Sequence, residues 1–188
     1  KITTVSGNYS PNTSTFRMSE GKWYWEIKLV AGLSANEVNM VGINKKSVQA
    51  STTSPATVGI NYRGNGKIWN DGGTAEQSGY ATFEAGNILM IAMDLTNATT
   101  GKLYFGVNGT YGNSGNPATG AGSYDFAKGT EPWGPSLTCY SSGSSVIFEA
   151  NFGGTQSFAI SSGNTDDNDR GNFEYDVPAG FLSLCTAN

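Results

Sequence analysis

The sequence predicts an all-β fold, a two-sheet antiparallel β-sandwich, from three observations. Apolar and polar residues alternate along several short segments, which is the period of a strand with one buried face. Residues 88–95 are instead apolar at nearly every position, as expected of a strand covered on both faces. Glycine accounts for 26 of the 188 residues and charged residues for only 14%. This composition is typical of β proteins with many tight turns.

A long central hairpin is predicted by residues 83–109. The apolar run is followed by residues 96–101, which have the composition of a turn. Residues 102–107 then alternate between apolar side chains and polar or small ones. Asn108 and Gly109 end this second strand with residues that tolerate positive φ. The apolar strand of this hairpin is therefore expected in the middle of the sandwich.

Other segments predict further short strands, about a dozen in all, and no segment has a helical period or a fixed repeat. Residues 23–30, WYWEIKLV, alternate most regularly. A turn at 63–66 separates residues 58–62 from residues 67–70, which indicates a second hairpin. The remaining expected strands are Ile2–Val5, Asn39–Asn44, Pro135–Tyr140 and Val146–Phe152, and Asp176–Leu184 is expected to close the domain. The aromatic residues expected in the core are Trp23, Trp25, Phe105, Phe148 and Phe152.

Two long polar segments interrupt this pattern. Residues 108–130 are the longest stretch without periodicity, and aperiodic loops of that length are usually functional or mobile. Residues 161–171 contain the chain's acidic cluster, Asp166 to Asp169. Clustered carboxylates can form a calcium loop, but the bidentate glutamate of an EF-hand is missing. A solvated acidic loop is the favoured interpretation, and we expect no metal site.

Composition also bounds the class of protein and partner. The length fits one domain, residues 1–188, which can bury about 70% of its unfolded surface. A net charge of −4 with 11 scattered basic residues argues against a nucleic-acid partner. No apolar run is long enough for membrane insertion. The chain begins at Lys1 without Met, so we expect a fragment or a processed form. Cys139 and Cys185 are expected as two free thiols, with one disulfide as the alternative.

Several of these stretches resemble, in order, the motifs of the SPRY (B30.2) family, whose fold is a concanavalin-like jelly-roll sandwich. The resemblance covers about residues 19–154, and its most specific part is the central hairpin. The stretches are GKWYWEIKL at 21–29, VGIN at 41–44, VGINYRGNGKIWNDG at 58–72, AGNILMIAMDLTNATTGKLYFGVNGT at 85–110, and PWGPSL with NFGG at 151–154.

Two segments depart from the eukaryotic SPRY pattern. They are the Gly/Asn/Ser-rich insertion NGTYGNSGNPATGAGSYDF after residue 107 and the ending GNFEYDVPAGFLSLCTAN. Both are similar to SPRY-like segments in tail and structural proteins of marine bacteriophages. The resemblance implies a non-catalytic recognition module, which we expect to be an adhesion module of a phage tail or fibre protein, on a virion or extracellular. The isolated domain is expected to be a monomer, within a parent protein that can be oligomeric.

Catalytic chemistry is not expected. The chain contains no His, which removes the commonest general base and the usual zinc ligands. A glycan-cleaving jelly-roll enzyme would need a carboxylate pair. Glu26 and Glu149 each stand alone in their strands, and the glucanase string E-x-D-x-x-E is absent. We therefore expect no enzyme and no cofactor, and we keep glycan cleavage as the second alternative.

The expected partner is a protein or a glycan on a cell surface. Aromatic rings beside amide side chains suit sugar and peptide sites, although each ring could equally pin its loop to the sandwich. A lectin-like carbohydrate-binding module of an extracellular protein is the first alternative. The resemblance implies that the contact loops lie at one end of the sandwich. For Asp71, a role as a turn residue is the alternative interpretation. The candidate ligand-binding residues are Tyr62, Arg63, Asn65, Trp69, Asn70, Asp71, Tyr111, Asn113 and Tyr124.

Overall fold

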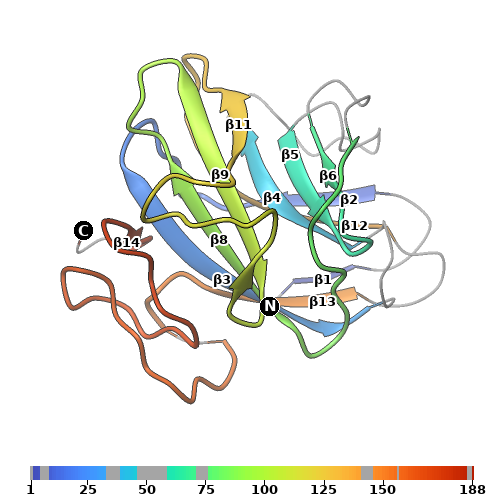
Figure 1. The fold of residues 1–188 in the computed structure, drawn as a ribbon. Helices are drawn as coiled ribbons and strands as arrows, with labels where there is room; N and C mark the ends of the chain where they lie inside the picture. The colour runs from blue at the N-terminus through green and yellow to red at the C-terminus, as the bar shows by residue number, and fades with distance from the viewer. Residues whose placement is uncertain are drawn as a thin grey trace. The chain divides into compact units, whose positions relative to one another are not determined.

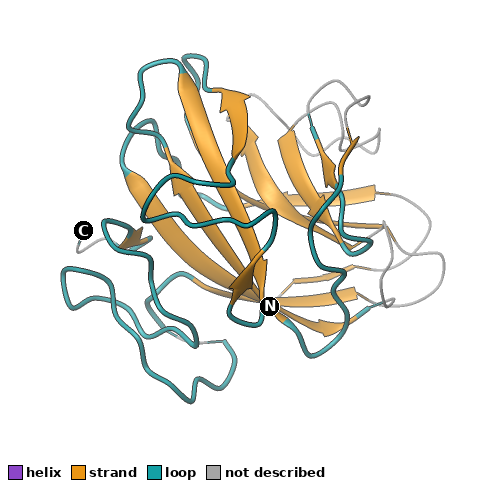
Figure 2. Cartoon of the chain, in the orientation of Figure 1, coloured by secondary structure: helices purple, strands orange, loops and turns teal. Residues whose placement is uncertain are grey.

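The computed structural model describes residues 2–4, 9–32, 39–45, 59–70, 76–140, 146–155, 157–185 and 188. Within these residues all regular secondary structure is β, in two sheets (Figures 1 and 2). Every strand pairing given for the described residues is antiparallel, except that of the short last strand. No described helix has the length and apolar character needed to cross a bilayer.

One sheet contains the predicted central hairpin. Its order is β1 (Ile2–Thr4), β13 (Val146–Asn151), β3 (Lys22–Ala31), β8 (Ile88–Asp94), β9 (Thr100–Val107) and β10 (Thr110–Tyr111). Off this path, β11 (Tyr124–Ala127) pairs with β9, and β14 (Leu182–Ser183) pairs in parallel with β3. The other sheet has the order β2 (Tyr9–Thr13), β12 (Trp133–Tyr140), β4 (Asn39–Lys45), β5 (Gly59–Arg63), β6 (Ile68–Trp69) and β7 (Glu76–Gln77).

By its contacts the chain divides into two compact units. The first unit contains residues 1–19, 29–87 and 130–148, and the second contains residues 20–28, 88–129 and 149–188. The prediction of one domain over the whole chain stays a prediction. The second unit holds most of the central hairpin and all of the C-terminal segment.

The central hairpin forms as its periodicity predicts. Strands β8 and β9 pair with Ile91 opposite Phe105, and both side chains are buried. Asn108 and Gly109 have φ of 48° and 87° and join β9 to β10 as a two-residue turn. The Asn108 side chain accepts a hydrogen bond of 2.9 Å from the backbone N–H of Ile88. This turn therefore also fastens the start of the neighbouring strand.

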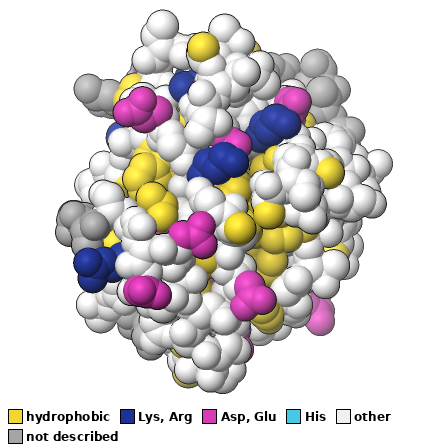
Figure 3. Space-filling model, turned by 60° about the vertical axis from the view of Figure 1, so that its left-hand side comes forward, with side chains coloured by type: hydrophobic (Ala, Val, Ile, Leu, Met, Phe, Trp, Pro, Cys, Tyr) yellow, Lys and Arg dark blue, Asp and Glu magenta, His cyan; other side chains and the backbone are white. Residues whose placement is uncertain are grey.

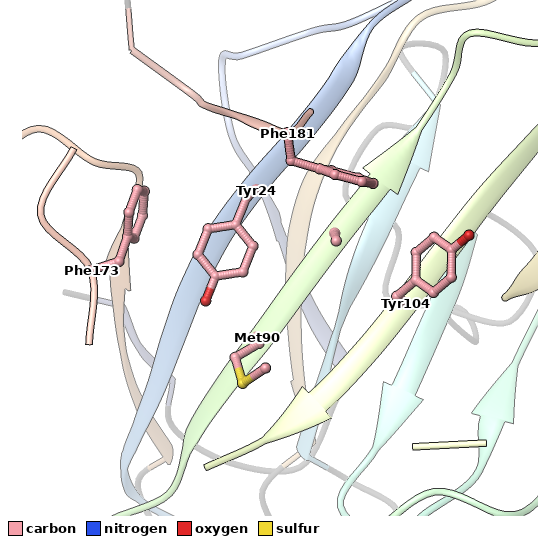
Figure 4. Close-up of a cluster of buried hydrophobic side chains, with 6 residues drawn as sticks. Tyr24, Met90, Tyr104, Phe173 and Phe181 are labelled. Carbon is pink, nitrogen blue, oxygen red and sulfur yellow. The ribbon is translucent and has the colours of Figure 1, made fainter. Parts of the chain in front are cut away.

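Strand β3 is covered on both faces in its middle, beyond what its alternation predicts. Trp25 is buried on one face, and Tyr24 and Glu26 on the other are each 0% exposed. A cluster of buried side chains lies on the Tyr24 face of strands β3, β8 and β9 (Figure 4). Its members are Tyr24, Met90, Ala92, Tyr104, Phe173 and Phe181.

Residues 151–185, here called the C-terminal segment, supply the cover of that face. Their regular structure is limited to the end of β13 and the two residues of β14 (Figure 2). Phe173 lies 5.0 Å from Tyr24 between ring centroids in an edge-on arrangement, and Phe181 lies 6.4 Å from Tyr104. The Tyr24 face of strand β8 is thus covered by a segment with little regular secondary structure, which packs there through Phe173 and Phe181.

Residues 108–130 differ from the long aperiodic loop that the sequence predicts. They form strands β10 and β11, and both strands pair with β9. The prediction is wrong at these two strands, which are only two and four residues long, while residues 112–123 between them contain no strand. The predicted core is otherwise confirmed for Trp25, Phe105 and Phe148, while Trp23 and Phe152 are only half-buried.

Replacing Phe181 by Ala tests whether the C-terminal segment belongs to the folding unit. The side chain is 0% exposed, so its removal should cost about 3–5 kcal/mol through lost transfer energy and a cavity. Denaturant unfolding measures this free energy. Val30→Ala is the control, because Val30 is 39% exposed and should cost under about 1 kcal/mol. Similar losses in the two variants would contradict the packing described.

Candidate functional site

Glu26 anchors the C-terminal segment to strand β3. Its Oε1 accepts hydrogen bonds from the Tyr24 hydroxyl at 2.9 Å and the Tyr175 N–H at 2.8 Å. Its Oε2 accepts from the Glu174 N–H at 3.0 Å and from Asn151 Nδ2 at 3.5 Å. Burial raises the pKa of this carboxyl, and the four donors partly offset that rise. The backbone at residues 174–175 is therefore held in place directly.

Asp166 is a second anchor, inside the segment itself. Its Oδ1 accepts from the N–H groups of Asn168 and Arg170, both at 2.9 Å. Its Oδ2 accepts from the Ser183 N–H at 2.8 Å, the Ser183 hydroxyl at 2.7 Å and Asn188 Nδ2 at 2.7 Å. Burial alone would raise the pKa of Asp166, but these donors lower it to about 2.

This arrangement corrects the interpretation of residues 166–169 as a solvated acidic loop for Asp166 alone, since residues 167–169 are exposed. Asp166 is only 5% exposed: its Oδ1 accepts from N–H groups within the loop, and its Oδ2 ties the loop to Ser183 of β14. Asp167 similarly accepts a 2.7 Å bond from the Gly180 N–H. In the described part of the chain, no group of three or more His, Cys, Asp or Glu side chains is arranged to hold a metal. Cys185, two residues after Ser183, carries a free thiol.

The hairpin β9–β10 positions Tyr111 beside the same cluster. The Tyr111 ring lies edge-on to Tyr104 at 6.5 Å and packs against the buried cluster. Its hydroxyl is buried, and no described residue is its hydrogen-bond partner. Burial, together with the charge of Glu26, raises the pKa of Tyr111. The side chain is thus fixed with its hydroxyl inward.

A pocket of about 520 Å³ lies within the second unit, between the loop after the hairpin and the C-terminal segment. Met90 of strand β8 contributes to its lining. The hairpin side supplies Gly109, Tyr111, Gly115, Asn116, Pro117 and Ala118, and the segment supplies Ser162, Asn164, Glu174, Tyr175, Asp176 and Pro178. We call this the outer pocket. Its volume is in the usual range for ligand sites, about 300–1,000 Å³.

The charged residues in the lining of the outer pocket are Glu174 and Asp176, and the lining contains no Lys or Arg. The carboxylate of Glu174 accepts from the Ser161 N–H at 2.6 Å and the Ser161 hydroxyl at 2.5 Å. These bonds lower the pKa of Glu174. Asp176 is exposed. Figure 3 shows the side on which the C-terminal segment lies: hydrophobic side chains gather near the middle of this face, two basic side chains lie next to each other above them, and acidic side chains are spread around.

The predicted site residues of the first unit gather at the β5–β6 hairpin. Tyr62 is 1% exposed, and its hydroxyl donates to the carbonyl of Ala81, which gives it a structural role. The Arg63 guanidinium lies 4.3 Å from the centre of the Trp69 ring. Arg63 is itself only 5% exposed, whereas Trp69 is half-buried. Of these three residues, Trp69 offers the most surface.

The remaining predicted residues are divided between the units. Asn65 and Asn70 are half-buried beside the same hairpin, and Asp71 lies outside the described residues. In the second unit Tyr124 is 8% exposed in strand β11. Asn113 has φ of 54° and donates from Nδ2 to the Gly122 carbonyl at 3.2 Å, so it shapes its loop. Tyr111 alone of the predicted residues lines the outer pocket.

Sequence reasoning missed the polar groups of the outer pocket, including Asn116, Asn164, Glu174 and Asp176. A signal was present in Tyr175, an aromatic residue between two acidic ones in a turn-rich segment. The criterion that selected Tyr111, a ring beside polar loop residues, applies equally to Tyr175. This criterion identifies one more residue of the pocket, but it does not predict that the loop after the hairpin and the C-terminal segment lie side by side.

The fold is similar to that of two solved human domains. The SPRY domain of human HERC1 matches with a TM-score of 0.58 and 20% identity, covering 78% of this chain and 85% of that one. A second human SPRY domain matches with a TM-score of 0.52 and 16% identity, covering 79% of this chain and 94% of that one. The chain has the SPRY fold.

These likenesses confirm the predicted fold class, an antiparallel β-sandwich of the SPRY type. At 20% and 16% identity they show the fold alone. No protein-family model matches the sequence, and no curated protein matches it. The stretches that resemble SPRY motifs end near Gly154, so the C-terminal wall of the outer pocket lies beyond them.

Acid should loosen the C-terminal segment through Asp166. Because its pKa falls from 3.8 to about 2 on folding, its stabilisation is present above about pH 4 and is lost as the pH falls toward 2. Asp166→Asn should remove this part of the acid sensitivity and cost about 2 kcal/mol at pH 7. Hydrogen exchange of residues 161–185 across pH measures both effects. Asp169→Asn, at an exposed position, is the control; equal behaviour of the two variants would contradict the anchor.

Proposed function

We propose that this chain is a non-catalytic recognition module that binds a surface partner through the outer pocket. One observation carries the proposal. The two segments that depart from the SPRY pattern are those that supply most of the pocket's lining: the insertion after residue 107 and the ending from residue 171. The two segments are far apart in the sequence, and both depart from the SPRY pattern, yet they line the same pocket. A ligand that binds there explains this better than a requirement of the fold does.

The resemblance of both segments to marine phage tail and structural proteins supports a more specific role. We propose an adhesion module of a tail or fibre protein, displayed on a virion, with a protein or a glycan of the host surface as its partner. A lectin-like module of an extracellular protein would use the same pocket. The two roles differ in the partner's location and leave the binding chemistry unchanged.

Binding is favoured over catalysis by the state of the carboxylates. Glu174 and Asp176 both line the outer pocket, and a glycoside hydrolase uses a pair of carboxyl groups. A general acid, however, needs a raised pKa, and the Ser161 hydrogen bonds lower the pKa of Glu174. Glu26 has a raised pKa but is buried, and Tyr24, Asn151 and two N–H groups already donate to it. Neither Glu174 nor Glu26 is therefore suited to protonate a leaving group.

Filling the outer pocket should abolish binding whatever the ligand is. Ala118 lines the pocket and is exposed, so Ala118→Trp places a large ring there without disturbing the core. Ala121→Trp is the matched control, because Ala121 is exposed in the same loop and outside the lining. Flow cytometry of the labelled chain on a panel of marine bacterial strains should show binding to some strains, reduced at least tenfold by Ala118→Trp alone. No binding strain, or equal binding by both variants, would reject the proposal.

The chain should leave glycans intact. Incubation with β-glucans and chromogenic glycosides should release no product above the level of Glu174→Gln and Asp176→Asn variants, because a general acid needs a raised pKa and the hydrogen bonds from Ser161 lower the pKa of Glu174. Reducing-end assays and chromatography of the products measure this. Turnover by the parent that is lost in either variant would instead favour the glycan-cleaving alternative.

A further inference from the structure

The outer pocket has a chemistry that selects among ligands, beyond the fact of binding. Two kinds of surface are present in its lining. Tyr111, Pro117, Pro178 and Met90 supply rings and apolar groups. Asn116, Ser162, Asn164 and the two carboxylates supply polar groups.

The aromatic surface is rigid. Tyr111 and Tyr175 both line the pocket and both pack partly against the buried cluster around Tyr24 and Met90. Tyr175 is additionally fixed by the 2.8 Å bond from its N–H to Glu26. Rings that are already immobilised lose little conformational entropy when a ligand stacks on them. They favour a ligand with a flat apolar face.

The polar groups include both donors and acceptors. Asn116 is exposed; its Oδ1 accepts from the Thr119 N–H at 3.3 Å, while no described residue accepts from its Nδ2. The Ser162 hydroxyl is exposed as well. Asn164 uses its Nδ2 on the carbonyl of Glu174 at 3.0 Å, and no described residue donates to its Oδ1. Asp176 adds an exposed carboxylate.

This distribution disfavours two ligand classes on physical grounds. With two carboxylates and no Lys or Arg in the lining, the pocket repels anionic groups such as phosphate, sulfate or a sugar acid. A cationic side chain would be attracted by the two carboxylates, but it carries no acceptor for the donors of Asn116 and Ser162. A ligand whose groups both donate and accept satisfies every polar group of the lining.

We infer that the outer pocket binds an uncharged oligosaccharide, whose hydroxyls pair with Asn116, Ser162, Asn164 and Asp176 while a sugar face lies on the tyrosine side. Sugar hydroxyls each donate and accept, and the apolar face of a pyranose ring suits an aromatic surface. This assignment rests on the proposed function, since it names the partner class of the same pocket.

The decisive variant is Asn116→Asp. It keeps the acceptor that caps the Thr119 N–H, removes the Nδ2 donor, and adds a negative charge. An uncharged saccharide should lose about tenfold in affinity, the effect of one hydrogen bond. A cationic peptide should instead gain affinity from the extra charge. Asn97→Asp is the matched control: Asn97 is exposed in the β8–β9 turn, its Oδ1 likewise accepts from Thr99 and Thr100 N–H groups, and it lies outside the pocket.

The full chain, its Asn116→Asp and Asn97→Asp variants, and Ala118→Trp are tested on an array of neutral glycans, acidic glycans and basic peptides. The inference expects neutral-glycan binding that Asn116→Asp weakens about tenfold, Asn97→Asp leaves unchanged, and salt from 0.05 to 0.5 M alters less than about twofold. Binding of acidic glycans or basic peptides only, or unchanged glycan binding by Asn116→Asp, overturns it. Binding to cells that Ala118→Trp abolishes, with no neutral-glycan signal, overturns this inference and leaves the proposed function standing.

Discussion

The hydrogen bonds to the buried carboxylate of Glu26 are the interaction on which the second unit depends. A charged group is tolerated inside a sheet face only when donors replace the water it has lost. Two of its donors are backbone N–H groups 148 and 149 positions further along the chain. The middle strand of the sheet can therefore keep this glutamate only while the C-terminal segment is in place. Removing either partner would leave a buried charge or orphaned N–H groups, which is more costly than the bonds themselves are worth.

The same contact decides where the segment's polar side chains point. Residues 174 and 175 are held by their backbone, and their side chains line the outer pocket, with the Glu174 carboxylate held by Ser161 and Tyr175 packed against the buried cluster. Asp166, which precedes these residues in the chain, anchors the segment in the same way by accepting hydrogen bonds from Ser183. An irregular segment with only one short strand of its own thus gains the rigidity that a binding wall needs, because anchored backbone positions its side chains before a ligand arrives.

The SPRY fold and the outer pocket come from different parts of the chain. The strands that carry the family motifs build the sheets, and the segments outside those motifs supply most of the pocket's lining. A shared scaffold therefore says little about the partner, which is decided by the groups grafted onto it. The Arg63–Trp69 stack in the first unit belongs to the scaffold by this criterion, since Arg63 is buried against the ring.

Strands with a local pattern could be predicted from the amino-acid sequence. The apolar run of β8, the alternation of β3 and β9 and the Asn108-Gly109 turn are each readable from neighbouring residues, because strand period and turn conformation depend on them alone. Only the tertiary structure decided what covers the Tyr24 face, since Phe173 and Phe181 show no periodicity. It also separated residues that look alike in sequence. Tyr62 and Tyr111 are both rings beside polar turns, yet Tyr62 is buried and Tyr111 lines the outer pocket. Asp166 reads as solvated in an acidic run, yet it is buried, because its donors come from residues up to 22 positions away. Burial of a polar group depends on distant partners, and a local pattern carries no record of them.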